Sequence, residues 1–213
     1  RQFMDNDATV AGLAENVAGV SAGAHSSVFL TLGTGVGGGI VIGGKVFSGA
    51  HGVGSEIGHM IIELDGNQCN CGNRGCLERY TSATAIIRMA KEAVKDNPDC
   101  AIMKKAGGNP DRINAKLVID AAKENDPVGV KVFDQYTDYL AMACNNIIQF
   151  LDPDMVVLGG GVSHAGDFLL DAVRAKVPNY ILNKNLPYSD IKLAKLRNEA
   201  GIIGAALLGR AAE

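Results

Sequence analysis

Three cysteines near the middle of the chain constrain its fold more than any other feature. Cys69, Cys71 and Cys76 follow the pattern Cys-x-Cys-x4-Cys, with Gly72 and Gly75 between the last two. Glycines permit the tight turn that brings three thiolates to one point, and thiolates bind Zn²⁺. The pattern predicts a metal-binding loop; unpaired core thiols or a redox pair are the alternatives.

A structural zinc ion takes four ligands, so this loop requires one more side chain. His59 is the nearest upstream histidine and is the expected fourth ligand, with His51 as its competitor. Four protein ligands leave no open coordination position, so the predicted role of the metal is structural.

Charge and composition exclude several classes of protein. The 213 residues include 20 Lys and Arg against 23 Asp and Glu, a net charge of −3, and no basic block occurs. Neither a nucleic acid nor an anionic membrane is therefore an expected partner, and no apolar run reaches the roughly 18 residues of a membrane span. The odd number of cysteines, five, does not fit a secreted disulfide framework, so we expect a cytoplasmic location.

Helical and strand patterns interleave along the chain and predict the α/β class. One helix is expected to begin near residue 7, at a capping Asn6-Asp7 pair, and others near residues 81, 116 and 121. Three more are expected over 128–151, 167–176 and 202–208. The expected strands cover 27–32, 40–42, 60–64, 155–158 and 191–194. The sequence contains neither an internal repeat nor a linker long enough to divide it.

Glycine is the compositional outlier, with 27 among 213 residues, about twice the average usage. Residues 33–39 predict a hairpin with a glycine-rich tip, where N–H groups can converge on a phosphate; a tight turn without a ligand is an equal alternative. Residues 159–161 lie between the end of a strand and a helix, the place where ligands bind in open α/β sheets. The alternative is that these glycines only allow the helix to pack closely on the strand. Two such turns in one chain indicate a nucleotide between them.

Polar side chains on loops form a candidate sugar-binding set: Asn6, Asp7, Glu56, His59 and Glu78. Each has a simpler explanation, because Asn6 or Asp7 can cap a helix and Glu78 can be a solvated surface charge. Together, their oxygens can accept hydrogen bonds from sugar hydroxyls. A carboxylate beside a hydroxyl can also take its proton during in-line phosphoryl transfer.

These motifs together resemble the ROK family, which contains sugar kinases of the actin-like ATPase (ribonuclease H-like) fold, repressors and open reading frames of unassigned role. The resemblance runs from residue 5 to the end and rests on four segments in order: Asn6-Asp7-Ala8, residues 32–39, Glu56-Ile57-Gly58-His59 and residues 69–78. It implies that residues 1–213 are the large C-terminal lobe of a sugar kinase, with a zinc-binding loop.

The resemblance also implies roles for individual residues. Asp7 is the expected catalytic base and Asn6 its sugar-binding neighbour. Glu56, His59 and Glu78 are expected to bind the sugar, and His59 to bind zinc as well, with Cys69, Cys71 and Cys76. The expected cofactors are ATP, Mg²⁺ and structural Zn²⁺, with no dedicated cage for Mg²⁺. The phosphates would lie on Gly33, Thr34, Gly35 and Gly37, and the adenosine on Gly159, Gly160 and Gly161.

One departure from the family is informative. Its first phosphate loop, Asp-x-Gly-Gly-Thr, is absent from these residues, as is the smaller N-terminal lobe that carries it. The last helix, about 202–213, would return toward that lobe and could instead be exposed or buried in a dimer. The 213 residues alone are therefore expected to have little or no kinase activity.

The substrate expected from the resemblance is a hexose. Glu56-Ile57-Gly58-His59 resembles the glucokinase branch, which implies phosphorylation of glucose to glucose 6-phosphate by ATP. Fructose, mannose and N-acetylmannosamine remain alternatives, as does polyphosphate as the phosphoryl donor. A sugar-responsive repressor is the alternative from another class, but a repressor has no need to hold ATP. A homodimer is expected by analogy with the family.

Overall fold

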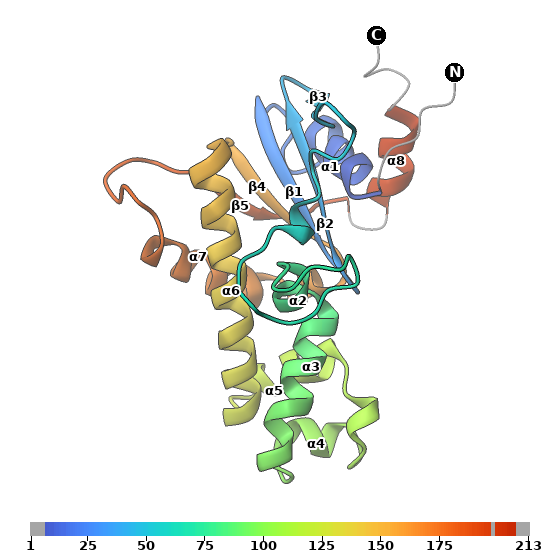
Figure 1. Ribbon diagram of the computed structural model, residues 1–213, viewed down its shortest axis with the longest axis vertical. Helices are drawn as coiled ribbons and strands as arrows, with labels where there is room; N and C mark the ends of the chain where they lie inside the picture. The colour runs from blue at the N-terminus through green and yellow to red at the C-terminus, as the bar shows by residue number, and fades with distance from the viewer. Residues whose placement is uncertain (1–6, 197–198, 208–213) are drawn as a thin grey trace.

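The computed structural model describes residues 7–196 and 199–207 (Figure 1). Within them, one five-stranded sheet has the order β3-β2-β1-β4-β5. β1 pairs antiparallel with β2 and parallel with β4, which in turn pairs parallel with β5. The strands are β1 (Ser26–Leu32), β2 (Val36–Ile42), β3 (Lys45–Val46), β4 (Met155–Gly159) and β5 (Asp190–Leu193). The sheet is therefore mixed, and helices and strands interleave along the chain as the predicted α/β class requires.

The helices cover both faces of this sheet and extend beyond one end of it (Figure 1). They are α1 (Asp7–Ala18), α2 (Glu78–Thr81), α3 (Ala83–Ala93), α4 (Ala101–Lys105), α5 (Ala115–Lys123), α6 (Pro127–Leu151), α7 (Asp167–Lys176) and α8 (Ala200–Leu207). The long helix α6 begins where the Asp126 carboxylate accepts the Gly129 N–H, with Pro127 in its first turn. It ends at Asp152, which has a left-handed backbone. The expected helix over 128–151 is confirmed.

The two faces of the sheet pack against different helices. Val28, Leu30 and Leu32 are fully buried in the core that also contains Leu140 and Cys144 of α6. Phe29 lies on the opposite face and packs against α1. A Cβ added at Gly12 of α1 would lie 3.1 Å from the Cβ of Phe29. Successive residues of a strand point to opposite faces, so β1 holds the two layers together.

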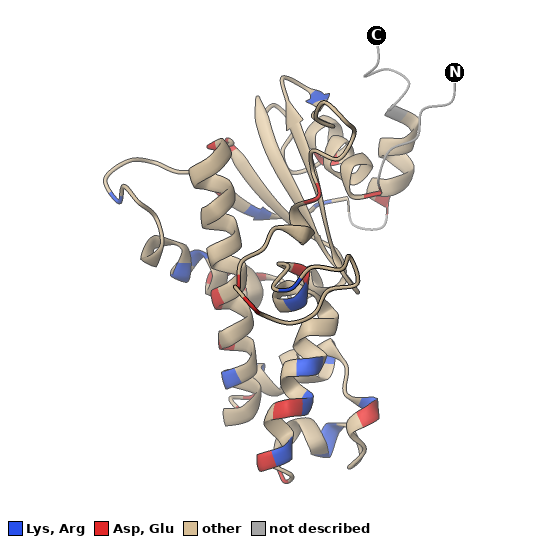
Figure 2. Ribbon diagram, viewed as in Figure 1, with Lys and Arg blue, Asp and Glu red and all other residues tan. Residues whose placement is uncertain are grey.

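The helices beyond the sheet carry charged residues of both signs. Basic and acidic residues occur together on α3 and α6, and α4 ends in two lysines (Figure 2). Several of them form surface ion pairs, such as Lys105 with Glu124 at 2.6 Å. No helix within the described residues is both long and apolar enough to cross a membrane.

The expected hairpin is present, but its tip is shorter than the sequence predicted. Only residues 33–35 form the turn, and residues 37–39 belong to β2. The reason is close packing: a Cβ at Gly39 would lie 2.7 Å from the Ala8 carbonyl oxygen, and one at Gly38 would lie 2.6 Å from that of Ser55. These glycines therefore admit α1 and the 55–57 segment against the strand rather than bend it.

The expected strand over 60–64 is wrong. Only Ile61 forms an isolated bridge, with Cys76, and the Ile62 N–H donates to the Gly75 carbonyl. The segment lies beside the turning cysteine loop, which offers too short an edge for a ladder. The short helices expected near residues 116 and 121 form a single helix, α5. The last helix spans Ala200–Leu207, and its expected end at residue 208 lies outside the described residues.

Candidate metal centre and ligand cavities

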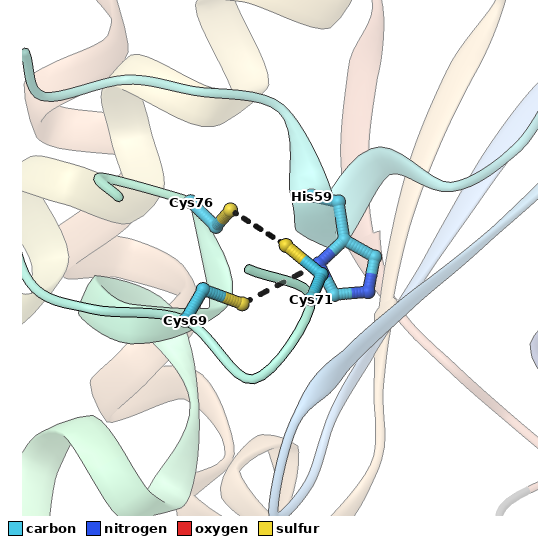
Figure 3. Close-up of side chains that lie close together, drawn as sticks. All are labelled: His59, Cys69, Cys71 and Cys76. Carbon is cyan, nitrogen blue, oxygen red and sulfur yellow. Dashed lines mark hydrogen bonds between the residues drawn. The ribbon is translucent and has the colours of Figure 1, made fainter. Parts of the chain in front are cut away.

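The predicted metal ligands come together in one cluster. The ligand atoms of His59, Cys69, Cys71 and Cys76 all lie within 4.8 Å of one another (Figure 3). His59 ends a short 3-10 helix, and the cysteines lie on the following loop, residues 69–76, which we call the metal loop. His51 is not part of this cluster.

Two distances within the cluster match the edges of a tetrahedral zinc shell. Zn–S and Zn–N bonds of about 2.3 and 2.0 Å give tetrahedron edges of about 3.8 Å between sulfurs and 3.6 Å between sulfur and nitrogen. The Cys71 and Cys76 sulfurs are 3.6 Å apart, and the Cys69 sulfur lies 3.6 Å from Nδ1 of His59. The residues present could therefore hold a zinc ion with little rearrangement.

Local hydrogen bonds shape the metal loop. The Gln68 side-chain amide donates to three carbonyl oxygens of the loop, those of Cys69, Gly72 and Asn73. The Cys69 N–H donates to the Asn73 carbonyl at 2.9 Å. The turn is thus formed by the protein's own contacts, which presents the three sulfurs on one side.

The three thiols of the loop differ in acidity. Burial, with a smaller contribution from the hydrogen bond to Glu78, raises the pKa of Cys69 to about 12. Burial also raises the pKa of Cys76. The exposed Cys71 has a lowered pKa, chiefly because the Asn73 N–H donates to its sulfur. Cys71 is therefore the thiol that loses its proton most readily.

Glu78 joins the metal loop to the tip of the β1–β2 hairpin. Its Oε1 accepts a hydrogen bond from the Cys69 thiol at 3.0 Å. Its Oε2 lies on the other side, 2.8 Å from the position that a Cβ at Gly35 would occupy. This candidate sugar-binding carboxylate thus lies between the metal cluster and the candidate phosphate loop.

Asp7 lines a cavity at the opposite face of the sheet. As the first residue of α1, it borders a cavity of about 450 Å³, which we call the Asp7 cavity. Gly160 and Gly161 form part of its wall, as do Thr31 of β1 and residues of α8. The structure therefore brings the candidate base and the second glycine turn together. Asn6, its expected neighbour, lies outside the described residues.

The second glycine turn also borders another cavity. This cavity, of about 620 Å³, lies against α5, and we call it the α5 cavity; Gly161 and His164 line both it and the Asp7 cavity. Gly160 has a φ of +80°, and a Cβ there would lie 2.6 Å from the Leu32 nitrogen. The turn between the two cavities is thus held tightly against the end of β1.

Glu56 is positioned differently from the other candidates. Its backbone carbonyl accepts the His59 N–H at 3.0 Å, so it begins the turn that presents the histidine. Its side chain is exposed and borders a mainly apolar cavity of about 250 Å³, with Val53 and Phe150. The cavities described here do not place the Glu56 carboxylate beside Asp7.

Several residues that line the Asp7 and α5 cavities were not predicted from the sequence. His164 borders both cavities and could have been found, because it closely follows the glycine turn. Thr31 could have been found by its place just before the hairpin tip. Asn114 and Ile119 of the α5 cavity carry no signal in the sequence, because only the packing of α5 places them there.

The sheet order and the glycine turns define an α/β protein of the actin-like ATPase class, a fold shared with the ROK structures it resembles. The sequence matches the ROK family over residues 2–212. The chain belongs to the ROK family.

Similar proteins include both enzymes and regulators. The chain is 40% identical over 204 residues to the glucokinase of Thermotoga maritima, covering 96% of this chain and 64% of that protein. A ROK family glucokinase from Streptomyces griseus, solved with glucose and AMPPNP, superposes with a TM-score of 0.91 at 34% identity, over 97% of this chain and 67% of that one. A ROK family transcriptional regulator superposes with a TM-score of 0.83 at 28% identity, over 97% of this chain and 51% of that one. The chain thus spans less than two thirds of the length of the Thermotoga enzyme.

Proposed function

We propose that these residues belong to an ATP-dependent sugar kinase that phosphorylates glucose. The observation that carries the proposal is Asp7, which begins α1 and shares a cavity with Gly160 and Gly161. A carboxylate beside a glycine turn places a proton acceptor next to a site suited to a nucleotide. The similarity to the Thermotoga and Streptomyces glucokinases supports the choice of sugar.

In this proposal, Asp7 acts as the general base. Its carboxylate accepts the proton of the sugar hydroxyl as that oxygen forms a bond to the γ-phosphorus of ATP. The bond from that phosphorus to the bridging oxygen breaks, and ADP leaves with the electron pair. The products are sugar 6-phosphate, ADP and one proton. When bound with ATP, Mg²⁺ offsets the charge of the phosphates.

The nucleotide would extend across both cavities. The Asp7 cavity holds the reacting phosphate beside Thr31 and Gly160. The α5 cavity, lined in part by Ile119 and Val162, suits the base and ribose. His164 and Gly161, which line both cavities, would contact the nucleotide between these parts.

The metal would act on the sugar site through His59. Cys69, Cys71, Cys76 and Nδ1 of His59 would hold Zn²⁺, which fixes the orientation of the imidazole. The second ring nitrogen would then be available to a sugar hydroxyl. Zinc is thus structural in this proposal, and His59→Ala is expected to lose zinc and sugar affinity together; a zinc-free variant with full sugar affinity would refute this.

A sugar-responsive repressor is the second candidate, because the transcriptional regulator superposes over 97% of the chain. Asp7 and the glycine turn at residues 159–161 favour the kinase, since a repressor needs neither a base nor an ATP site. The two functions differ in whether ADP is released.

The test measures ADP release by the full polypeptide that the gene encodes. ATP and Mg²⁺ are supplied with glucose, mannose, fructose, N-acetylglucosamine or N-acetylmannosamine in turn. We expect turnover on glucose, and a loss of roughly a thousandfold or more in Asp7→Ala, because a positioned base contributes on that order. Asp111→Ala is the matched control, because Asp111 pairs with Lys91 on the surface and lines neither cavity.

Two outcomes would contradict the proposal. Full turnover in Asp7→Ala would remove the base from its role. Binding of a sugar without turnover on any of the five would favour the repressor, and operator binding would then be measured.

A further inference from the structure

The tip of the β1–β2 hairpin, residues 33–35, is fastened to the N-terminus of α3. The Ala83 N–H donates to the Gly33 carbonyl at 2.8 Å. The Thr84 hydroxyl donates to the Thr34 carbonyl at 2.7 Å. The first turn of α3 is itself fixed, because the Ser82 hydroxyl accepts the Ala85 N–H as its cap. Two successive carbonyl groups of the tip therefore point toward the same helix end.

These two hydrogen bonds determine where the N–H groups of the tip point. The described chain contains no cis peptide bond, and in a trans peptide the C=O and the following N–H point in opposite directions. The N–H groups of Thr34 and Gly35 consequently both point away from α3. Successive backbone N–H groups directed to one side form an anion-binding surface.

We infer that Thr84 is a positioning residue for phosphate binding: its hydroxyl orients the hairpin tip so that the Thr34 and Gly35 N–H groups face the nucleotide phosphates. This inference rests on the proposed function, since it takes the ligand to be a nucleotide. Ala83, its neighbour, also borders the α5 cavity. Thr31, two residues before the tip, borders the Asp7 cavity, which is the space assigned to the reacting phosphate.

The Thr84 hydroxyl matters because little else restrains the Thr34 peptide. Within the tip, the Gly33 N–H donates to the Gly35 carbonyl, which leaves the carbonyls of Gly33 and Thr34 to be held from outside. Thr84 is exposed, so its side chain contributes its hydroxyl rather than buried surface. Valine at this position keeps the branched shape and removes only the donor.

The test compares Thr84→Val with Thr84→Ser in the full polypeptide. We expect the valine variant to bind AMPPNP roughly three- to tenfold more weakly, the range given by one lost hydrogen bond. The serine variant should keep the parental affinity, and glucose affinity should be unchanged in both. Thr137→Val is the matched control, because the Thr137 hydroxyl bonds to backbone carbonyls within α6 instead.

A second measurement separates this inference from the proposed function. ¹⁵N relaxation reports the order of the Thr34 and Gly35 amides without any ligand, and we expect it to fall in Thr84→Val and to be kept in Thr84→Ser. Parental affinity and parental order in the valine variant would overturn the inference, as would a serine variant that behaves like valine. Absence of AMPPNP binding in the parent protein would instead overturn the nucleotide as ligand, while a valine-specific loss of order would still support the orienting role.

Discussion

The three cysteines of the metal loop differ in burial and in acidity. Cys69 and Cys76 are buried with raised pKa values, whereas Cys71 is exposed with a lowered one. Metal binding requires all three sulfurs as thiolates. Cys71 would therefore be the first point of attachment for a metal ion, which would offset the cost of deprotonating the other two.

Removal of one thiol at this centre should remove the metal. We expect the parent protein to carry one zinc ion per chain and Cys71→Ser to carry almost none, because a structural site needs four ligands. Atomic emission after gel filtration measures this ratio. Cys100→Ser is the control: Cys100 lies at the start of α4, outside the cluster, and its loss should leave the zinc content unchanged. Equal zinc in both variants would show that the cluster is not the metal site.

The cluster of candidate metal ligands was predictable from the sequence, and much of the cavity lining was not. Cysteine spacing between glycines is a local property, and it led to His59, Cys69, Cys71 and Cys76. Ile119 reaches the α5 cavity through the packing of α5, and Thr84 reaches the hairpin tip through the packing of α3; no local pattern encodes either contact. Their roles follow from position in space, so only the structure could assign them.

Among the elements, α1 is held by a buried carboxylate. Glu15 is fully buried; its Oε1 accepts the Leu196 N–H at 2.7 Å, and its Oε2 accepts the Val20 N–H at 2.8 Å. The two bonds tie α1 to the loop after it and to the segment just before α8. Because Asp7 begins α1 and α8 lines the Asp7 cavity, Glu15 braces two walls of that cavity.

Replacing this carboxylate should destabilise the protein. Glu15→Gln turns one acceptor into a donor that faces a backbone N–H, so we expect the free energy of unfolding to fall by about 2–3 kcal/mol. Urea unfolding measures the difference. Glu124→Gln breaks only a surface ion pair with Lys105 and should cost less than about 1 kcal/mol. Similar losses in the two variants would contradict the bracing role.

The junction of β1 with β4 should make stability depend on pH. The N–H and hydroxyl of Ser26 donate to Asp154 and hold the pKa of its carboxyl below the ordinary value of 3.8. A carboxyl with a lowered folded pKa stabilises the protein above its unfolded pKa and loses that contribution as pH falls through the folded value. The stability gap between the parent and Asp154→Ala should thus be constant above about pH 5 and shrink below about pH 4. An unchanged gap at pH 3, by urea unfolding, would disprove this.

The elements were predicted best where a periodic pattern coincided with end signals. The 128–151 helix lies between Asp126-Pro127 and Asp152-Pro153, and the structure agrees. Residues 37–39 were misassigned because glycine looks the same whether it bends the chain or admits a neighbour. The prediction of a strand over 60–64 was wrong because a pattern of apolar residues cannot show whether a neighbouring strand is available for pairing.

At the scale of the molecule, the 213 residues span 64% of the Thermotoga glucokinase. We expect them alone to turn over at least about a hundredfold more slowly than the full polypeptide, because the reacting phosphate needs groups on both sides to hold it in line. Coupled ADP assays on both proteins, with zinc content matched, measure this. Comparable rates would show that these 213 residues are sufficient for catalysis.

The packing of α8 against α1 has a consequence for synthesis on the ribosome. The two helices lie side by side (Figure 1), although α8 is translated after every other described element. The chain emerges from the ribosome N-terminus first, so the β1–β2 hairpin and the metal loop are synthesised while α1 still waits for its partner. A nascent chain could therefore form its metal cluster before it completes the wall beside Asp7, and the ability to bind a metal ion would precede the ability to hold a nucleotide.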